Sequence, residues 1–328
     1  MHLAGDIGGT KTALALFDEA QGPHRPIAQR TLASRDFPSF ADLARAYLSD
    51  VDQRPSCATL GVPGPVTEGH VTGTNLPWDM SEADLERDLG LDQVRLVNDL
   101  YALAQAVPAL EPDDIVTLNQ GNLRPGEAMA VVAPGTGLGA AYLVWNGSRY
   151  EPQPSEAGHS DWAPNSPLQG RLLNHLMDRF GHVSNERVCS GTGLPAIYAF
   201  LRDVEGYREP AELRARLDAA EDPVPIIVTE ALSGERAIPI CKATLDLFAE
   251  ILAAVAGNMA LAFLSRGGVY LGGGIPPKIL PALRQPAFFE AFCRKGRLDY
   301  VMRDIPLHII VHPAAGLLGA AVVSLGAS

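Results

Sequence analysis

The stretch that decides the fold lies at the start of the chain and reads His2-Leu-Ala-Gly-Asp-Ile-Gly-Gly-Thr-Lys-Thr-Ala-Leu-Ala-Leu-Phe-Asp18. Two short apolar segments flank a glycine pair, which is typical of two strands joined by a tight turn. The spacing nearly reproduces the phosphate loop that opens a helix, but Thr10 replaces its second glycine. Because Thr12–Phe17 has strand character, we expect a hairpin here and not a helix N-terminus.

A second turn of the same kind occurs in the middle of the chain. The apolar segment Met129–Ala133 leads into Pro134-Gly-Thr-Gly-Leu-Gly139, and a second apolar segment, Ala140–Trp145, follows. A third glycine run, Gly272-Gly-Gly274, follows the apolar segment Gly268–Leu271. Two hairpin turns that face each other across a cleft can offer backbone N–H groups to phosphate without a Cβ in the way. The combination predicts a phosphate site, whereas one such turn alone would indicate only a hairpin.

The remaining periodicity predicts a mixture of strands and helices without repeats or a flexible linker. Apolar residues at helical spacing, together with breakers, predict helices over residues 39–48, 167–180, 193–201, 240–264 and 316–324. Ser81 fits a helix N-cap, with Asp84 three residues later. Further strands are expected at 29–33, 57–62, 94–97 and 307–311, whereas 203–225, rich in charge and proline, is expected to lie on the surface. We therefore expect an α/β protein of two domains with a cleft.

Charge and composition exclude some classes of function. The chain has 328 residues and a net charge of -12, with 26 basic and 38 acidic residues. A nucleic-acid-binding protein usually carries a basic stripe, and no basic run here is longer than Arg294-Lys295. We expect no nucleic-acid partner. An acidic chain does not attract a polyanion over long range, so an ATP site must rely on local backbone groups.

The cysteines and the apolar segments indicate a cytoplasmic protein. Cys57, Cys189, Cys241 and Cys293 are widely spaced, which predicts reduced, buried thiols and no CxxC motif. A strand-like segment begins almost at once, so we expect no signal peptide. The longest uncharged apolar run, Ile251–Ser265, is shorter than the ~20 residues that span a bilayer. We expect no membrane association.

The glycine-rich turns resemble those of a known superfamily. Asp6-x-Gly8-Gly9-Thr10 resembles the first phosphate loop of the actin, sugar-kinase and heat-shock chaperone superfamily, Gly135–Gly139 its second, and Leu271–Ile275 its adenosine loop. Within the superfamily the chain is similar to bacterial glucokinases, from Gly5 to about Gly319. The blocks that carry this likeness are Leu76-Pro-Trp78, Asn98-Asp99, Glu156-Ala-Gly-His159 and Gly181-His-Val-Ser-Asn-Glu-Arg-Val-Cys-Ser-Gly191.

The resemblance implies a fold and its boundaries. It implies a two-domain, actin-like (ribonuclease H-like) α/β ATPase fold, with ATP and sugar in the interdomain cleft. The small domain would comprise residues 1–108 plus 313–328, and the large domain residues 109–312. Relatives are often homodimers, so a homodimer is expected.

The resemblance also implies roles for individual residues. Asp99 would be the base that accepts the proton of the sugar 6-hydroxyl. Ligands of the sugar would be Asn75, Asn98, Asp99, Glu156, His159 and Glu186. The nucleotide would contact Gly5, Asp6, Gly8, Gly9, Thr10, Lys11, Gly135, Thr136, Gly137, Gly273 and Gly274. Carboxylates and amides suit sugar hydroxyls because they hold directed hydrogen bonds.

Several assignments have a plainer alternative. Asp99 would equally suit a helix N-cap, Asn98 a turn, and Glu186 an exposed helix start. Lys11 stands where many glucokinases have an amide, so it is either a phosphate contact or a surface charge. In the related repressor–kinase family, the histidine equivalent to His159 is followed by a cysteine-rich zinc motif.

Metal and substrate follow from the same resemblance. No cysteine stands between His159 and Cys189, so we expect no structural zinc. Mg²⁺ would arrive with ATP and meet Asp6 through water. The expected reaction is ATP-dependent phosphorylation of glucose. The alternatives are a kinase for fructose, mannose or an N-acetylhexosamine, or a sugar-responsive regulator. The regulator would need a DNA-binding extension, which we do not expect before the first strand.

Overall fold

The protein consists of two compact units in the computed structural model, which describes residues 1–72, 76 and 78–326. The first unit comprises Met1–Asp114, Leu143–Gln153 and His312–Ser328, and the second comprises Ile115–Tyr142 and Pro154–Val311. The segment 143–153 groups with the first unit, although the boundaries expected from the sequence put it in the large domain. Those boundaries otherwise remain a prediction.

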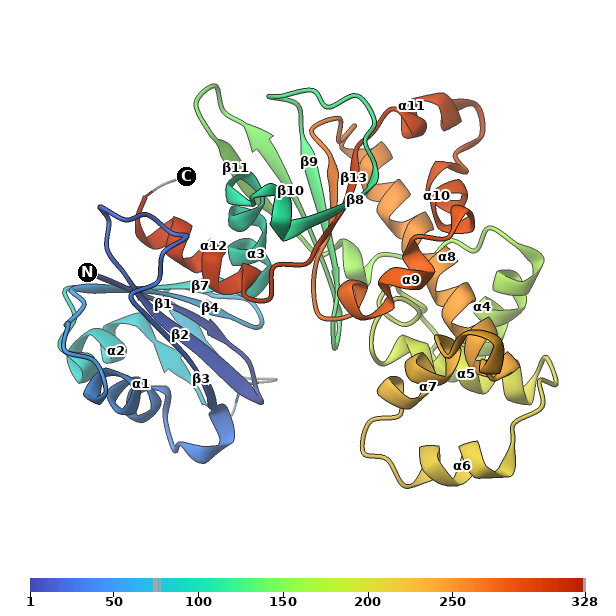
Figure 1. Cartoon of the computed structure of the whole chain (residues 1–328), viewed down its shortest axis with the longest axis horizontal. Coiled ribbons are helices and arrows are strands. Elements are labelled where there is room, and N and C mark those ends of the chain that lie inside the picture. The colour runs from blue at the N-terminus through green and yellow to red at the C-terminus, as the bar shows by residue number, and fades with distance from the viewer. Residues whose placement is uncertain (73–75, 77, 327–328) are drawn as a thin grey trace. The chain divides into compact units, whose positions relative to one another are not determined.

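The first unit is built on a five-stranded sheet with the order β3-β2-β1-β4-β7 (Figure 1). The strands are β1 (His2–Ile7), β2 (Lys11–Phe17), β3 (Ala28–Ala33), β4 (Cys57–Val62) and β7 (Gln93–Asn98), and a short antiparallel pair is formed by β5 (His70–Val71) and β6 (Met80–Ser81). β1 pairs with β2 in antiparallel register, whereas β1, β4 and β7 are parallel. The carboxyl ends of β1, β4 and β7 therefore meet at one edge of the sheet.

Alternation along the strands gives this sheet two apolar faces. Leu3, Leu14 and Leu16 share a core with Phe40 and Leu43 of α1, whereas Ala4, Ala15 and Phe17 pack against Leu317, Ala320 and Ala321 of α12. The helices are α1 (Phe40–Ser49), α2 (Glu82–Leu89), α3 (Asp99–Ala106) and α12 (Ala315–Ser324). Figure 1 shows α1 and α2 on one side of the sheet and α3 and α12 on the other.

Two helices of this unit begin at serine N-caps, of which the sequence predicted the one at Ser81. Ser39 accepts a hydrogen bond from the Asp42 N–H at the start of α1, and Ser81 accepts one from the Asp84 N–H at the start of α2. Such caps satisfy backbone donors that have no partner in the helix. The helix starts expected at residues 39 and 81 are confirmed.

The second unit contains the six-stranded sheet β11-β10-β9-β12-β13-β8. Its strands are β8 (Ile115–Asn119), β9 (Met129–Pro134), β10 (Leu138–Trp145), β11 (Tyr150–Ser155), β12 (Val269–Leu271) and β13 (Leu307–Ile310). β12 is parallel to both β9 and β13, so their carboxyl ends lie at the same edge.

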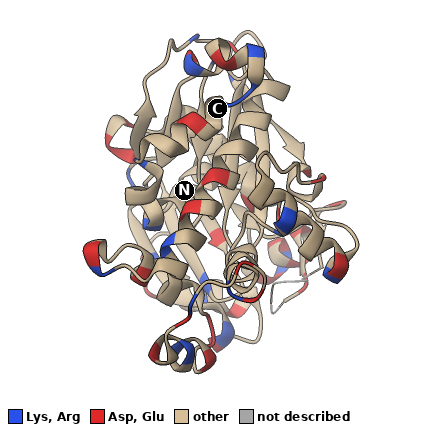
Figure 2. Cartoon of the chain, turned by 90° about the vertical axis from the view of Figure 1, so that its right-hand side faces the viewer, with Lys and Arg blue, Asp and Glu red and all other residues tan. Residues whose placement is uncertain are grey.

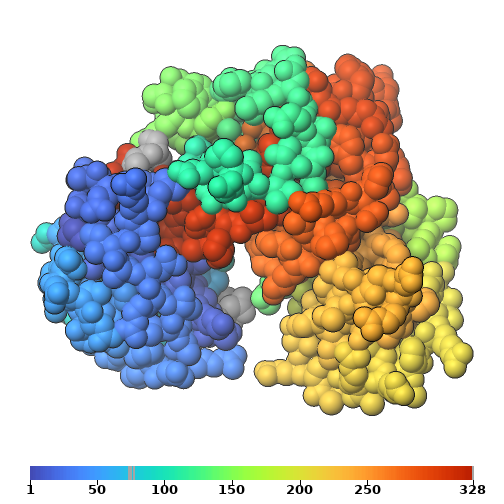
Figure 3. Space-filling model, viewed as in Figure 1, coloured from blue at the N-terminus to red at the C-terminus, as the bar shows by residue number. Residues whose placement is uncertain are grey.

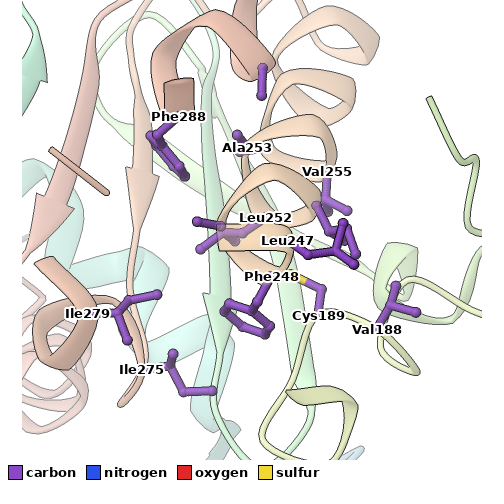
Figure 4. Close-up of a cluster of buried hydrophobic side chains, with 14 of the residues drawn as sticks. Val188, Cys189, Leu247, Phe248, Leu252, Ala253, Val255, Ile275, Ile279 and Phe288 are labelled. Carbon is purple, nitrogen blue, oxygen red and sulfur yellow. The ribbon is translucent and has the colours of Figure 1, made fainter. Parts of the chain in front are cut away.

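The long helix α8 (Pro239–Ala262) is the centre of the second core. Figure 4 shows Phe248, Leu252 and Val255 of this helix among apolar side chains that include Ile279 and Phe288. By length and composition alone the helix could cross a membrane, which the shorter run expected from the sequence could not. The helix agrees with the one expected over 240–264, and it is longer than the uncharged run because it also includes residues 239–250. Most of its apolar window is buried in the core, which explains its composition.

The other helices of the second unit surround α8 or lie on the surface. They are α4 (Pro167–Phe180), α5 (Gly193–Asp203), α6 (Ala211–Asp218), α7 (Val224–Ala231), α9 (Leu280–Leu283), α10 (Pro286–Cys293) and α11 (Asp299–Arg303). Segment 203–225 lies at the surface as expected, but it contains α6, which was not predicted. Leu213 is the buried residue of α6, so apolar periodicity could not reveal the helix. In Figure 3, α6 and α7 (gold) form part of the outer surface of this unit.

The charged residues are distributed over the surface of many elements. Figure 2 shows acidic and basic segments interspersed on the face turned to the viewer. Most of the ion pairs described are short-range and exposed, such as Arg214 with Asp218 and Lys242 with Asp246. Exposed pairs of this kind contribute little to stability.

Candidate active site

Asp6, Gly61 and Asn98 lie together where three parallel strands end. The register pairs Asp6 of β1 with Gly61 of β4, and Val62 of β4 with Asn98 of β7. A Cβ on Gly61 would lie 3.4 Å from the Ala102 Cβ and 3.9 Å from the Asp99 Cα. The glycine therefore leaves room for the start of α3. Ligand sites of α/β proteins commonly occupy such an edge.

Asn98 is the N-cap of α3, and Asp99 is the first helical residue. The Asn98 side-chain oxygen accepts hydrogen bonds from the N–H groups of Leu100 at 3.0 Å and Tyr101 at 3.2 Å. Its amide nitrogen donates to the Gly64 carbonyl at 3.0 Å. The capping role considered for Asp99 thus belongs to its neighbour. Asp99 itself accepts the Leu100 N–H at 2.8 Å.

The two carboxylates at this edge, Asp6 and Asp99, both have raised pKa values. Burial and, secondly, the negative charge of Asp99 raise the pKa of Asp6 to about 6. Burial also raises the pKa of Asp99, against hydrogen bonds from backbone N–H groups and Asn98 that lower it. Asp99 nevertheless keeps access to solvent, so a substrate can reach its carboxylate. A Cβ on Gly316 would lie 2.7 Å from an Asp6 oxygen, so the first turn of α12 lies against this carboxylate.

The first glycine-rich turn joins β1 to β2. The Gly8 N–H donates to the Lys11 carbonyl at 3.0 Å, and β2 is a strand along its whole length. The helix-opening phosphate loop is therefore excluded, as the sequence predicted. Gly5 lies inside β1, where a Cβ would meet Leu60 at 2.8 Å, so this glycine serves packing of the strands. Thr10 and Lys11 are exposed.

The second turn, Gly135–Gly137, connects β9 and β10 in the other unit. The Gly135 N–H donates to the Gly137 carbonyl at 2.8 Å, and the Gly191 N–H donates to the Gly135 carbonyl at 2.8 Å. A carboxylate oxygen of Glu186 accepts the N–H of Leu138 at 2.9 Å. A Cβ on Gly137 would lie 2.5 Å from the same oxygen. The Glu186 side chain therefore holds the backbone at the end of this turn.

The two sequence blocks around Gly158 and Glu186 meet at this turn. The Glu186 N–H donates to the Gly158 carbonyl at 2.9 Å. The amide nitrogen of Asn185 donates to the Ala157 carbonyl at 3.1 Å. A Cβ on Gly158 would lie only 2.1 Å from the Leu138 carbonyl oxygen. Residues 135–139, 156–159 and 185–191 thus form one cluster, although they are distant in sequence.

Glu156 and His159 point outward from this cluster. Glu156 precedes the short 3₁₀ turn Ala157–His159, and the His159 Nε2 lies 3.9 Å from a Glu156 carboxylate oxygen. Both side chains are largely exposed. They are therefore free to form hydrogen bonds with a polyhydroxyl ligand.

The third glycine run lies beside the second turn. A Cβ on Gly273, whose φ is +78°, would lie 2.6 Å from the Pro134 carbonyl oxygen. The Gly272 N–H donates to the Val132 carbonyl at 2.9 Å. Gly273 is thus required by both its backbone conformation and its close approach to β9. Gly274 has open space around its Cβ position.

The predicted site residues fall into two groups. The first unit brings together Gly5, Asp6, Gly8, Gly9, Thr10, Lys11, Asn98 and Asp99, and the second brings together Gly135, Thr136, Gly137, Glu156, His159, Glu186, Gly273 and Gly274. Asn75 lies outside the described residues. Sequence reasoning missed Ser34 and Ser190, two buried serines that hydrogen-bond to the backbone beside the two turns. Ser190 lies in the block 181–191 that carries the likeness to glucokinases, whereas nothing in the sequence around Ser34 distinguishes that serine.

Among the described residues, no group of three His, Cys, Asp or Glu side chains could hold a metal ion. The cysteines described are free thiols, with Cys189, Cys241 and Cys293 buried. Asp6 and Asp99 nevertheless fit a divalent cation that arrives with its own ligands. Hard cations prefer carboxylate oxygens, and a cation here would offset both the burial and the repulsion from Asp99 that raise the pKa of Asp6.

The two α/β units and their glycine-rich turns define a sugar kinase of the actin-like two-domain fold. A family model described as Glucokinase matches residues 3–326 of the chain. The chain is 36% identical over 335 residues to a glucokinase of Nostoc punctiforme, covering 98% of this chain and 97% of that protein. It is 36% identical over 318 residues to a glucokinase of Cronobacter sakazakii, covering 97% and 95%.

A solved structure agrees with the sequence comparisons. The crystal structure of a glucokinase from an Antarctic psychrotroph matches with a TM-score of 0.84 and 33% identity, covering 99% of this chain and 98% of that one. The chain belongs to the glucokinase family, and it is a kinase that phosphorylates glucose. The fold class and the enzyme class expected from the sequence are confirmed.

Proposed function

We propose that the enzyme transfers the γ-phosphoryl group of ATP to the 6-hydroxyl of D-glucose, with Asp99 as general base. The observation that supports this role is the position of Asp99, at the start of α3 and beside the end of β1. A carboxylate fixed by backbone hydrogen bonds and open to solvent can accept a proton from a bound hydroxyl. Burial raises its pKa, which makes it a stronger base.

Asp6 would face the metal that accompanies ATP. When bound, Mg²⁺ neutralises charge on the transferred phosphoryl group. The chain supplies a carboxylate whose pKa is raised to about 6, so that the ionised form gains from a nearby cation. We place one or more waters between Asp6 and the metal, because Mg²⁺ retains much of its hydration shell.

The phosphates of ATP would bind to backbone N–H groups of the two turns. The first turn would contribute Gly8, Gly9 and Thr10, and the second would contribute Gly135–Gly137. Gly5 and Lys11 are proposed as further contacts of the nucleotide. Gly273 and Gly274 would approach the adenosine. This arrangement suits a chain with a net charge of -12, because N–H groups attract phosphate without a basic patch.

The sugar would be held by Asn75, Asn98, Asp99, Glu156, His159 and Glu186. Exposure of Glu156 and His159 supports this proposal, since both side chains have unused hydrogen-bonding capacity. Glu186 would serve two purposes, because one of its oxygens accepts the Leu138 N–H. Asn98 would have only part of its amide left for the sugar, since it caps α3 and contacts Gly64.

The test is ADP production from ATP with Mg²⁺ and a panel of sugars. The panel contains glucose, fructose, mannose, galactose, N-acetylglucosamine and no sugar, and each is measured with the wild type and Asp99→Asn. The substitution keeps the size of the side chain and its capacity to accept the Leu100 N–H. A melting temperature equal to that of the wild type therefore serves as the control for folding. We expect a rate confined to glucose that falls by ~10²–10⁴-fold in the variant. A rate that is equal with and without sugar would contradict the proposal.

Finer properties belong to the same proposal. We expect a cytoplasmic homodimer without structural zinc. Light scattering in solution determines the mass of the assembly, and elemental analysis of protein purified without chelator determines the zinc content. A stoichiometric amount of zinc, or a monomer at assay concentration, would contradict these expectations.

A further inference from the structure

Ser34 lies beneath the first glycine-rich turn and contacts its backbone at two points. It begins a 3₁₀ turn, Ser34–Asp36, that follows β3, and it is 0% exposed. Its hydroxyl donates to the Gly8 carbonyl at 2.6 Å, and its N–H donates to the Thr10 carbonyl at 3.0 Å. One residue thus holds two of the carbonyl groups in the turn.

These two hydrogen bonds determine where the N–H groups of the turn point. In a trans peptide the C=O and the following N–H point in opposite directions within one plane. Since the Gly8 carbonyl points toward Ser34, the Gly9 N–H points away from it. The same argument applies to the Thr10 carbonyl and the Lys11 N–H. Both N–H groups therefore point away from Ser34, which is buried, whereas Thr10 and Lys11 are exposed.

A second hydroxyl supports Ser34 from the buried side. The Thr12 Oγ1 lies 3.0 Å from the Ser34 Oγ, and Thr12 is also 0% exposed. Because the Ser34 hydroxyl hydrogen is used at the Gly8 carbonyl, the Thr12 hydroxyl is the donor of this pair. Removal of Thr12 would therefore leave the bond between Ser34 and Gly8 in place. The chain thus offers a control that disturbs the same cluster without releasing the turn.

We propose that Ser34 is a positioning residue for the phosphate donor: it holds the turn so that the N–H groups of Gly9 and Lys11 point toward the phosphates. The inference rests on the proposed function, since it takes the turn to be a phosphate site. Ser34 itself contacts no substrate. It acts on the energy of ATP binding and leaves the sugar ligands untouched.

The experiment compares Ser34→Ala with Thr12→Val. For each, KM for ATP and for glucose are measured, together with the melting temperature and the Kd for Mg-ATP by calorimetry without sugar. We expect Ser34→Ala to raise KM and Kd for ATP by about three- to tenfold, the worth of one hydrogen bond. KM for glucose should stay within about twofold. Thr12→Val should lower the melting temperature with less than about a twofold change in ATP affinity.

Ser34→Cys keeps the side-chain volume and provides only a weak donor, so it tests the same bond if Ser34→Ala does not fold. We expect a change in ATP affinity in the same direction. Unchanged ATP affinity in both Ser34 variants would overturn the inference, and so would an equal loss in Thr12→Val, which would indicate general loosening. A wild type that binds Mg-ATP but phosphorylates no sugar would instead overturn the proposed function.

Discussion

Gly319 of α12 lies so close to α3 that a Cβ on it would be 1.6 Å from the Ala102 carbonyl oxygen. The two helix backbones therefore pack directly against each other. Because α3 begins at Asp99, this contact fixes the helix that carries the proposed base. Small residues on both helices, including Ala106 and Ala320, make this approach sterically possible.

We predict that Gly319→Ala destabilises the enzyme by about 3 kcal/mol, as expected for overpacking between backbones that cannot move apart cheaply. Urea denaturation measures the effect. Gly170→Ala in α4 is the matched control, because nothing lies within 4 Å of its Cβ position. That change should stabilise the protein by up to about 1 kcal/mol, since alanine favours helices over glycine. Equal effects of the two substitutions would contradict the close contact.

Glu186 connects a proposed sugar ligand to the second phosphate turn through its bond with the Leu138 N–H. We predict that Glu186→Ala raises KM for ATP as well as for glucose by about tenfold, since the turn loses an acceptor for a backbone donor. Glu186→Gln retains a side-chain oxygen for Leu138 and should preserve KM for ATP while it raises KM for glucose. Initial rates over a grid of both substrates separate the two constants. An unchanged KM for ATP in Glu186→Ala would contradict the connection.

Asn98 has a capping role that can be separated from its proposed contact with the sugar. Asn98→Ala should lower the free energy of unfolding by about 1 kcal/mol, because α3 loses its N-cap. Serine is also a good N-cap, so Asn98→Ser should recover most of that stability. Both variants should raise KM for glucose to a similar degree, because neither keeps the amide. Full recovery of glucose affinity in Asn98→Ser would show that the residue acts only as a cap.

The fold and the identity of the glycine turns were predictable because their signals are local. The turn after Ile7, the helix start at residue 39, the cap at Ser81 and the apolar period of α8 are each encoded within a short stretch of sequence. α6 gave no such signal, since half of its residues are charged and Leu213 alone is buried. Its position follows from packing with the rest of the unit, which a local pattern does not contain.

The candidate site could be predicted as a set of residues but not as a set of contacts. The likeness to glucokinases indicated Asp99 and Glu186, and their roles remain proposals. It did not indicate that Asn98 caps α3 or that Glu186 accepts the Leu138 N–H. It also gave no reason to select Ser34. The pairing of β2 with β3 brings this serine to Gly8, which is 26 residues away in the sequence. Such contacts arise from tertiary structure, so no local sequence pattern encodes them.

His308 provides a test of pH dependence that is independent of the site. It lies in β13, is buried, stacks on Tyr270 at a ring distance of 5.0 Å, and places its Nδ1 3.0 Å from the Thr117 hydroxyl. Burial lowers the pKa of His308, because desolvation disfavours the charged imidazolium. The folded state therefore binds a proton less readily than the unfolded state.

The sign of the effect follows from linkage. Since the folded pKa of His308 lies below its unfolded value, its contribution to stability is complete above the unfolded pKa of ~6.5 and is lost as the pH falls toward the folded pKa. We predict that His308→Asn, which keeps an acceptor near Thr117, reduces the loss of stability between pH 7 and pH 5. Urea denaturation at several pH values measures the slope, and Thr117→Val, which keeps the histidine, is the control that should retain a steep slope. An unchanged slope in His308→Asn would show that other groups dominate the acid sensitivity of this unit.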